Sequence, residues 1–116
     1  MRHRLHDRFI SSSNRPMWEN FTSAVSIYNP EGWRMIDEYI MRKPFILFFD
    51  QEEDATMIEF PEGNEITPVL EDCSGFEFYV TNCETDYILC FNHHDFLIGT
   101  GEASKWSALQ ANKVLS

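Results

Sequence analysis

Short apolar runs alternate with short polar turns between residues 44 and 101, and this spacing constrains the fold more than any other feature of the chain. Five runs have the length and the aromatic content of strands, and they span residues 44–50, 56–62, 76–82, 87–92 and 96–101. Most of the turns between them are too short for a crossover connection. Consecutive strands are therefore predicted to pair antiparallel.

One segment, residues 62–75 ("EGNEITPVLEDCSG"), has no single interpretation. Gly63, Asn64 and Pro68 favour a loop. One helical turn and a short edge strand within this loop stay open as alternatives.

Helical spacing of apolar residues is confined to the two ends of the chain. Residues 15–28 are predicted to form a first helix, because Trp18, Phe21, Val25 and Tyr28 recur at helical spacing. A second helix should begin at Asn29 and Pro30, which are typical of helix starts, and should end before Pro44.

Residues 102–115 are predicted to close the chain as a third helix, with Trp106 and Leu109 facing inward. Grouped strands with helices at the ends indicate an α+β fold: two N-terminal helices, an antiparallel sheet of about five strands and one C-terminal helix. The helices that carry Trp18, Trp33 and Trp106 should cover one face of the sheet. The other face should be at least partly open to solvent or to a partner.

The length of 116 residues predicts one domain. Residues 1–14 lack periodicity and are predicted to form a mobile N-terminal arm, and residues 15–116 a single α+β domain. No apolar run is long enough to span a bilayer, and the basic start of the chain lacks the apolar core of a secretory signal. The odd number of cysteines, three, favours reduced thiols over a disulfide framework. We therefore expect a cytoplasmic protein that does not bind membranes.

The net charge of −10 is distributed unevenly along the chain. Residues 1–43 contain seven Arg or Lys and five Asp or Glu, whereas residues 44–104 contain fourteen Asp or Glu and no Arg or Lys. Such a segment repels itself, which lowers the stability of the fold. Solubility alone is one explanation. The other is recognition, because this field repels nucleic acid and attracts a basic partner.

The motif Asn92-His93-His94-Asp95 raises the question of catalysis or metal binding. Asn and Asp are favoured turn residues, so a four-residue hairpin turn is the preferred interpretation. A metal site would need His93, His94 and Asp95 with Cys73 or Cys83, but no ligand spacing typical of zinc sites is present. Acid–base catalysis by a histidine and contact with a partner stay open.

Nucleophilic catalysis would require Cys90 beside one of these histidines. Cys90 lies within a predicted strand, on the face opposite Leu89 and Phe91, where a buried thiol is inert. We therefore predict no catalytic residue, no bound metal and no cofactor. On the strand at 76–82, alternation places Tyr79 on the face opposite Phe78, where it could be exposed for binding.

These features together resemble a known class of protein. A small, acidic, aromatic-rich α+β chain resembles the immunity proteins of bacterial polymorphic and contact-dependent inhibition toxin systems. Residues 76–101, which include "FEFYVTN" and "DYILCFNHHDFLIGTG", are similar to bacterial proteins encoded beside such toxins. The resemblance implies a stoichiometric inhibitor, a monomer in a 1:1 complex that occludes the basic active-site cleft of a toxin nuclease. It implies no enzymatic activity.

The residues predicted to contact the toxin are acidic groups with a few aromatic anchors. They are Asp50, Glu52, Glu53, Asp54, Glu71, Asp72, Tyr79, Glu84, Asp86, His93, His94 and Asp95. Two alternatives stay open. One is an acidic inhibitor of another nucleic-acid-binding target, such as a phage protein that blocks a defence complex. The other is a small enzyme or metal protein that uses Cys90, His93, His94 and Asp95.

Overall fold

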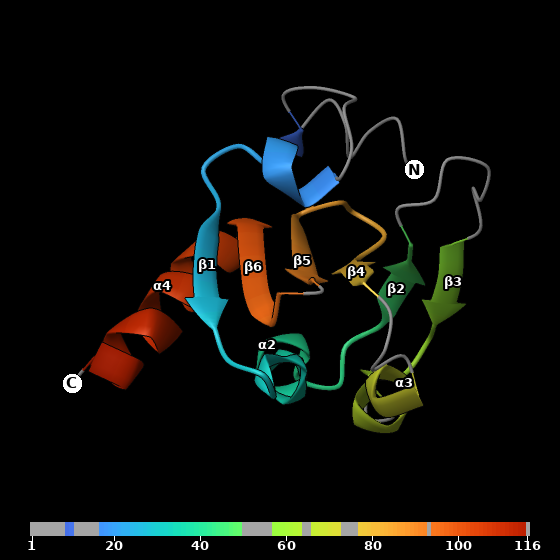
Figure 1. Ribbon diagram of the computed structural model, residues 1–116. Coiled ribbons are helices and arrows are strands. Elements are labelled where there is room, and N and C mark those ends of the chain that lie inside the picture. Colours follow the sequence, from blue (N-terminus) through green and yellow to red (C-terminus); the bar gives the residue numbers. More distant parts are fainter. Residues whose placement is uncertain are drawn as a thin grey trace.

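The computed structural model describes residues 9–10, 17–49, 57–63, 66–72, 77–92 and 94–115. In chain order its elements are η1 (Met17–Asn20), β1 (Val25–Tyr28), η2 (Gly32–Met35), α2 (Ile36–Ile40), β2 (Phe45–Phe48), β3 (Met57–Phe60), α3 (Ile66–Asp72), β4 (Phe78–Thr81), β5 (Tyr87–Phe91), β6 (Phe96–Gly101) and α4 (Ala103–Leu115) (Figure 1). No helix in these ranges is long and apolar enough to cross a membrane.

The described strands form one six-stranded antiparallel sheet in the order β1-β6-β5-β4-β2-β3. The predicted α+β class and antiparallel pairing are confirmed, and the five predicted strands all occur. Strand β2 lies inside the sheet, between β4 and the edge strand β3, and is buried throughout, as its continuous apolar sequence indicates. The hairpin β2–β3 ends at one edge of the sheet, and α3 then returns the chain so that β4 pairs with the other side of β2.

The prediction of a first helix at residues 15–28 is wrong. Residues 17–20 form only the 3-10 turn η1, and Val25–Tyr28 form the sixth strand, β1, at the edge beside β6. Val25 and Ile27 are β-branched and alternate with Ser26 and Tyr28, which is a strand pattern. Pairing with β6 therefore outweighs the helical spacing that Trp18, Phe21, Val25 and Tyr28 also satisfy.

The second and third helices are confirmed with shorter bounds. The second one is η2 followed by α2, and the side-chain Oδ1 of Asn29 accepts the backbone N–H of Glu31 at its start, at 2.9 Å. Met41 ends α2 in the left-handed conformation, with φ of 51°. In α4, Trp106 packs against the core as predicted, but Leu109 is 60% exposed.

The ambiguous segment at residues 62–75 contains the helix α3, which is longer than the single turn considered above. Pro68 is its third residue. Proline is tolerated there because the N–H groups of the first helical turn have no partner within the helix. The buried residues Ile66 and Leu70, four positions apart, hold α3 against the sheet.

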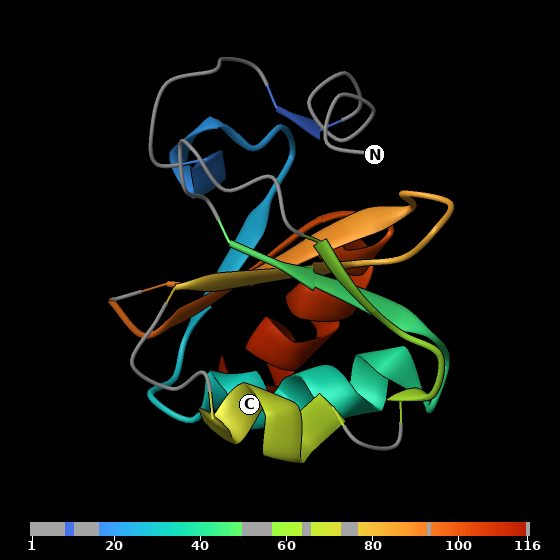
Figure 2. The ribbon, with the colours of Figure 1, turned by 90° about the vertical axis from the view of Figure 1, so that its right-hand side faces the viewer.

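The two faces of the sheet are covered by different parts of the chain. Helices α2, α3 and α4 cover one face, and η1 with its flanking residues lies over the other (Figure 2). Trp33 and Trp106 belong to the helical side, whereas Trp18 packs against the opposite face with Phe9 and Phe21. The prediction that all three tryptophans cover one face is therefore wrong for Trp18, because its segment does not form the predicted helix.

Two residues of the predicted N-terminal arm are part of the fold. Phe9 is buried, its carbonyl oxygen accepts the backbone N–H of Thr22 at 2.7 Å, and Ile10 forms a bridge with Phe21. The other residues of the arm, 1–8 and 11–14, lie outside the described residues. The second face of the sheet is therefore less open than predicted.

Candidate functional site: an acidic pocket at one end of the sheet

Asn92, His94 and Asp95 of the histidine motif lie in the turn between β5 and β6, as predicted. The side-chain Oδ1 of Asn92 accepts the backbone N–H groups of His94 and Phe96, both at 3.0 Å. Its backbone carbonyl accepts the N–H of Asp95, which adopts a left-handed φ of 65°. The Asp95 carbonyl in turn accepts the N–H of Asn29 at 2.9 Å, which ties the turn to the end of β1.

The described side chains of this motif and Cys90 are not brought together as a catalytic group. His94 is exposed, with its ring edge-to-face against Trp18 at 6.1 Å between ring centroids. Cys90 is buried on the face of Phe48 and Tyr79, opposite Leu89 and Phe91 as predicted. Within the described ranges, no three His, Cys, Asp or Glu side chains are grouped to hold a metal ion. His93 and Cys73 lie outside these ranges.

The turn between β4 and β5 lies at the other end of β5 and begins with a second asparagine. Asn82 Oδ1 accepts the backbone N–H of Asp86 at 3.0 Å, and its Nδ2 donates to Asp86 Oδ2, also at 3.0 Å. Thr85 adopts the left-handed φ of 53° that closes the turn. This double contact holds the Asp86 carboxylate in place while Glu84 stays exposed.

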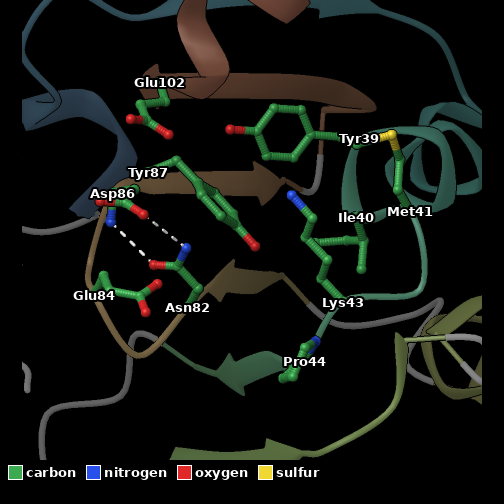
Figure 3. Close-up of a pocket in the computed structure, with 10 residues that line it drawn as sticks. All are labelled: Tyr39, Ile40, Met41, Lys43, Pro44, Asn82, Glu84, Asp86, Tyr87 and Glu102. Atoms are coloured by element: carbon green, nitrogen blue, oxygen red, sulfur yellow. Dashed lines mark hydrogen bonds between the residues drawn. The ribbon is translucent and has the colours of Figure 1, made fainter.

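A pocket of about 280 Å³ opens beside the β4–β5 turn. Its walls come from the end of α2, the segment that leads to β2, the β4–β5 turn and the residue before α4 (Figure 3). The lining residues are Tyr39, Ile40, Met41, Lys43, Pro44, Asn82, Glu84, Asp86, Tyr87 and Glu102. The pocket thus combines three carboxylates and one ammonium group with two tyrosines.

Sheet register explains why Glu102 joins this pocket. Tyr87 pairs with Gly101, the last residue of β6, so the residue after β6 lies beside the β4–β5 turn. The backbone N–H of Glu102 donates to the Asp86 carbonyl at 2.9 Å. Two carboxylates that are sixteen positions apart in sequence are therefore held at the same end of the sheet.

The surroundings of the pocket raise the pKa of both of its tyrosines. Burial, together with the carboxylates of Glu102 and Asp86, raises the pKa of Tyr39 to about 12. Burial is also the main reason that the pKa of Tyr87 is raised, with smaller contributions from Tyr39 and Asp86. The two rings pack edge-to-face at 4.8 Å between centroids. Both hydroxyl groups are therefore neutral at physiological pH.

The Tyr87 side chain is the most deeply placed polar group of the pocket. Tyr87 is only 4% exposed, and no described residue forms a hydrogen bond with its hydroxyl. That hydroxyl points into the space between Asn82 and Lys43 (Figure 3). A hydroxyl that opens onto a pocket and that no described residue engages can hydrogen-bond with a ligand there.

The structure divides the predicted contact residues between two ends of the sheet. Glu84 and Asp86 line the pocket, whereas His94 and Asp95 lie in the turn at the far end of β5. Five of the predicted contact residues lie outside the described residues: Asp50, Glu52, Glu53, Asp54 and His93. Glu71 and Asp72 are exposed at the end of α3.

Tyr79 is the predicted contact residue that the structure contradicts. It is 0% exposed, stacks on Phe48 and meets Phe21 edge-to-face. The alternation along β4 is right, but the face that receives Tyr79 is covered by the N-terminal residues. Tyr79 is a core residue, and Thr81 on the same strand is buried as well.

Sequence reasoning missed Tyr39, Lys43, Tyr87 and Glu102. They come from three separate parts of the chain, and no motif links them. The β5–β6 register was the available signal, because it places Glu102 next to Asp86. Comparison of the chain with family models, with curated proteins and with solved structures finds no match.

Proposed function

We propose that this chain is an immunity protein that neutralises a cognate bacterial toxin, a basic nuclease domain, by binding it through an acidic surface. The observation that carries the proposal is the pocket at the β4–β5 end of the sheet. There Glu84 and Asp86 of the β4–β5 turn and Glu102 before α4 lie around two neutral tyrosines. This arrangement combines negative charge with apolar rings, which is the composition expected of a site for basic side chains.

The charge distribution supports the same proposal. The acids of residues 44–104 are not offset by any Lys or Arg within that segment. Described members of this group are exposed on several elements, among them Glu59 on β3, Glu71 on α3 and Glu84 in the β4–β5 turn. Such a field accelerates the approach of a basic protein and disfavours nucleic acid.

The mechanism follows from what a nuclease needs. A nuclease holds the phosphates of its substrate with Lys and Arg, and carboxylates compete for those same groups. The proposed inhibitor acts by occupation of this cleft, as a monomer in a 1:1 complex in the cytoplasm. It requires no catalytic step and no cofactor.

The test is co-expression of the tagged chain with the reading frames adjacent to its own gene. We expect one of them to encode a basic domain that is toxic alone, harmless in the presence of this chain and purified with it at 1:1. Failure to find such a partner would contradict the immunity function.

The electrostatic part of the proposal has its own test in the association kinetics. Raising the salt concentration from about 0.05 to 0.5 M should slow association more than it speeds dissociation, because long-range attraction is screened. A partner whose association rate is indifferent to salt would contradict the role of the acidic surface while leaving inhibition itself intact.

A further inference from the structure

We propose that the pocket beside the β4–β5 turn receives one arginine side chain of the basic partner. The inference rests on the proposed function, because it names the group of the partner that this site binds. It concerns a site built from Tyr39, Tyr87, Glu84, Asp86 and Glu102. Four features of this site support the proposal: its carboxylates, the Tyr87 hydroxyl, its two aromatic rings and the nearby Lys43.

The carboxylates are distributed so that a flat cation can contact more than one of them. Glu102 lies on one side of the pocket, while Asp86 and Glu84 lie on another (Figure 3). Asp86 is fixed by its two contacts with Asn82, so part of the site is preorganised. A guanidinium group presents five N–H donors in a rigid plane and can bind carboxylates in two directions at once.

The Tyr87 hydroxyl is an independent indication that the pocket binds a ligand. The Tyr87 side chain is 4% exposed, it lines the pocket, and no described residue hydrogen-bonds to its hydroxyl. Because burial raises its pKa, this hydroxyl stays neutral and can accept an N–H from a bound cation. A donor in the pocket therefore meets an acceptor that no other described residue uses.

The aromatic rings favour arginine over lysine. Tyr39 and Tyr87 both line the cavity, and the hydroxyl of Tyr39 points toward Glu102 (Figure 3). A guanidinium plane stacks on aromatic rings and is more weakly hydrated than an ammonium, so it loses less on leaving water. The volume of about 280 Å³ exceeds what a single small ion would fill.

Lys43 is a competitor that the chain itself supplies. Its side chain is exposed and extends toward the tyrosines (Figure 3). No described acid lies within ion-pair distance of its ammonium group. The ammonium therefore repels an incoming cation without being held by the carboxylates. Removing it should strengthen the binding of arginine, which a purely structural role of these residues does not predict.

The experiment is an NMR titration of the full chain with N-acetyl-arginine amide, followed through the ring signals of Tyr39 and Tyr87. We expect saturable binding in the millimolar range, weaker binding of N-acetyl-lysine amide, and a loss of about fivefold for Glu102→Gln. Tyr87→Phe should weaken binding by a similar factor while the protein stays folded. Lys43→Ala should tighten it by about threefold.

Matched control variants distinguish the effect of the pocket on affinity from the effect of net charge. Glu38→Gln and Lys105→Ala change the net charge by the same amounts as Glu102→Gln and Lys43→Ala, at exposed positions that do not line the pocket. They should leave the affinity unchanged. Shifts that do not saturate, equal binding of the lysine amide, or equal effects of the control variants would overturn the proposal.

The outcome is distinguishable from that of the proposed function. If the arginine amide binds but no adjacent gene encodes a basic partner, the pocket stands and the immunity function fails. If a partner is found and its affinity is unchanged by Tyr87→Phe and Glu102→Gln, the immunity function stands and the arginine pocket is overturned.

Discussion

The turn before β5 and the turn after it are built on the same plan, with an asparagine at the start and an aspartate at or near the end. Each asparagine accepts backbone N–H groups through its Oδ1, and each turn contains one left-handed residue, Thr85 or Asp95. They differ in what surrounds them. Asn82 is half-buried at the edge of a pocket, whereas Asn92 is 3% exposed, and its Nδ2 has no partner.

The difference shows that reactive residue types do not by themselves mark a site. The turn with two histidines is used by the fold, since its asparagine and its aspartate connect β5, β6 and the end of β1. The turn "NCETD" contains no histidine and matches no catalytic motif. It nevertheless borders the pocket, because α2 and the start of α4 converge on that end of the sheet.

Replacing each asparagine by alanine should give the largest expected difference between the two turns. Asn92→Ala removes two backbone contacts in a buried place, so we expect a loss of about 2 kcal/mol in the free energy of unfolding. Asn82→Ala should lose about 1 kcal/mol, because the Asn82 side chain is only half-buried, whereas that of Asn92 is 3% exposed. Urea unfolding of both variants measures the difference. Equal losses, or a larger loss for Asn82→Ala, would contradict the structural role assigned to Asn92.

The same pair of variants should differ in the opposite sense in binding. Asn82→Ala releases the Asp86 carboxylate and should weaken the binding of N-acetyl-arginine amide, whereas folded Asn92→Ala should bind it as the original chain does. An effect of Asn92→Ala on this binding would show that the two ends of β5 are not independent.

The parts of this fold that were predictable are those with strong local signals. The five strands from β2 to β6, the short turns and the helix α4 follow from apolar runs, turn residues and helical spacing. Strand β1 was not predicted because its residues also satisfy helical spacing. Only pairing with β6, about seventy residues further along, decides between the two.

The candidate site was predictable only in part for the same reason. Glu84 and Asp86 are recognisable as acidic turn residues in a segment without positive charge. Tyr39, Tyr87 and Glu102 join them through sheet register and helix packing, which no local pattern encodes. Tyr79 failed as a predicted contact because residues far away in sequence, Phe9 and Phe21 among them, cover its face of the sheet.

The two ends of β5 should also differ in their response to alkaline pH. The pKa of Tyr39 is raised to about 12 in the fold from an ordinary value of 10.0, so the unfolded chain loses this proton first. The stability that the protonated Tyr39 hydroxyl contributes is fully present below pH 10 and is lost as the pH rises toward 12. The free energy of unfolding should fall by roughly 1 kcal/mol, because solvent partly screens this group.

Tyrosine variants provide the measurement and its control. Tyr39→Phe should reduce the fall in stability between pH 10 and 12, as measured by urea unfolding. Tyr28→Phe is the matched control, because Tyr28 is 61% exposed and packs on Phe96 at the β5–β6 end. If Tyr28→Phe flattened the pH profile as much as Tyr39→Phe does, the alkaline sensitivity would not belong to the pocket.

The smallest expected effect concerns the backbone of the β5–β6 turn. Asp95 has a φ of 65°, a conformation that glycine adopts freely and that disfavours a residue with a Cβ. Asp95→Gly should therefore change the free energy of unfolding by less than about 0.5 kcal/mol, since relief of strain offsets the greater freedom of glycine in the unfolded chain. Asp95→Ala removes the same carboxylate without this relief and should lose about 1 kcal/mol. Thermal unfolding of the two variants side by side measures how much the backbone strain at Asp95 lowers stability. Equal stabilities would show that the left-handed conformation of Asp95 does not destabilise this turn.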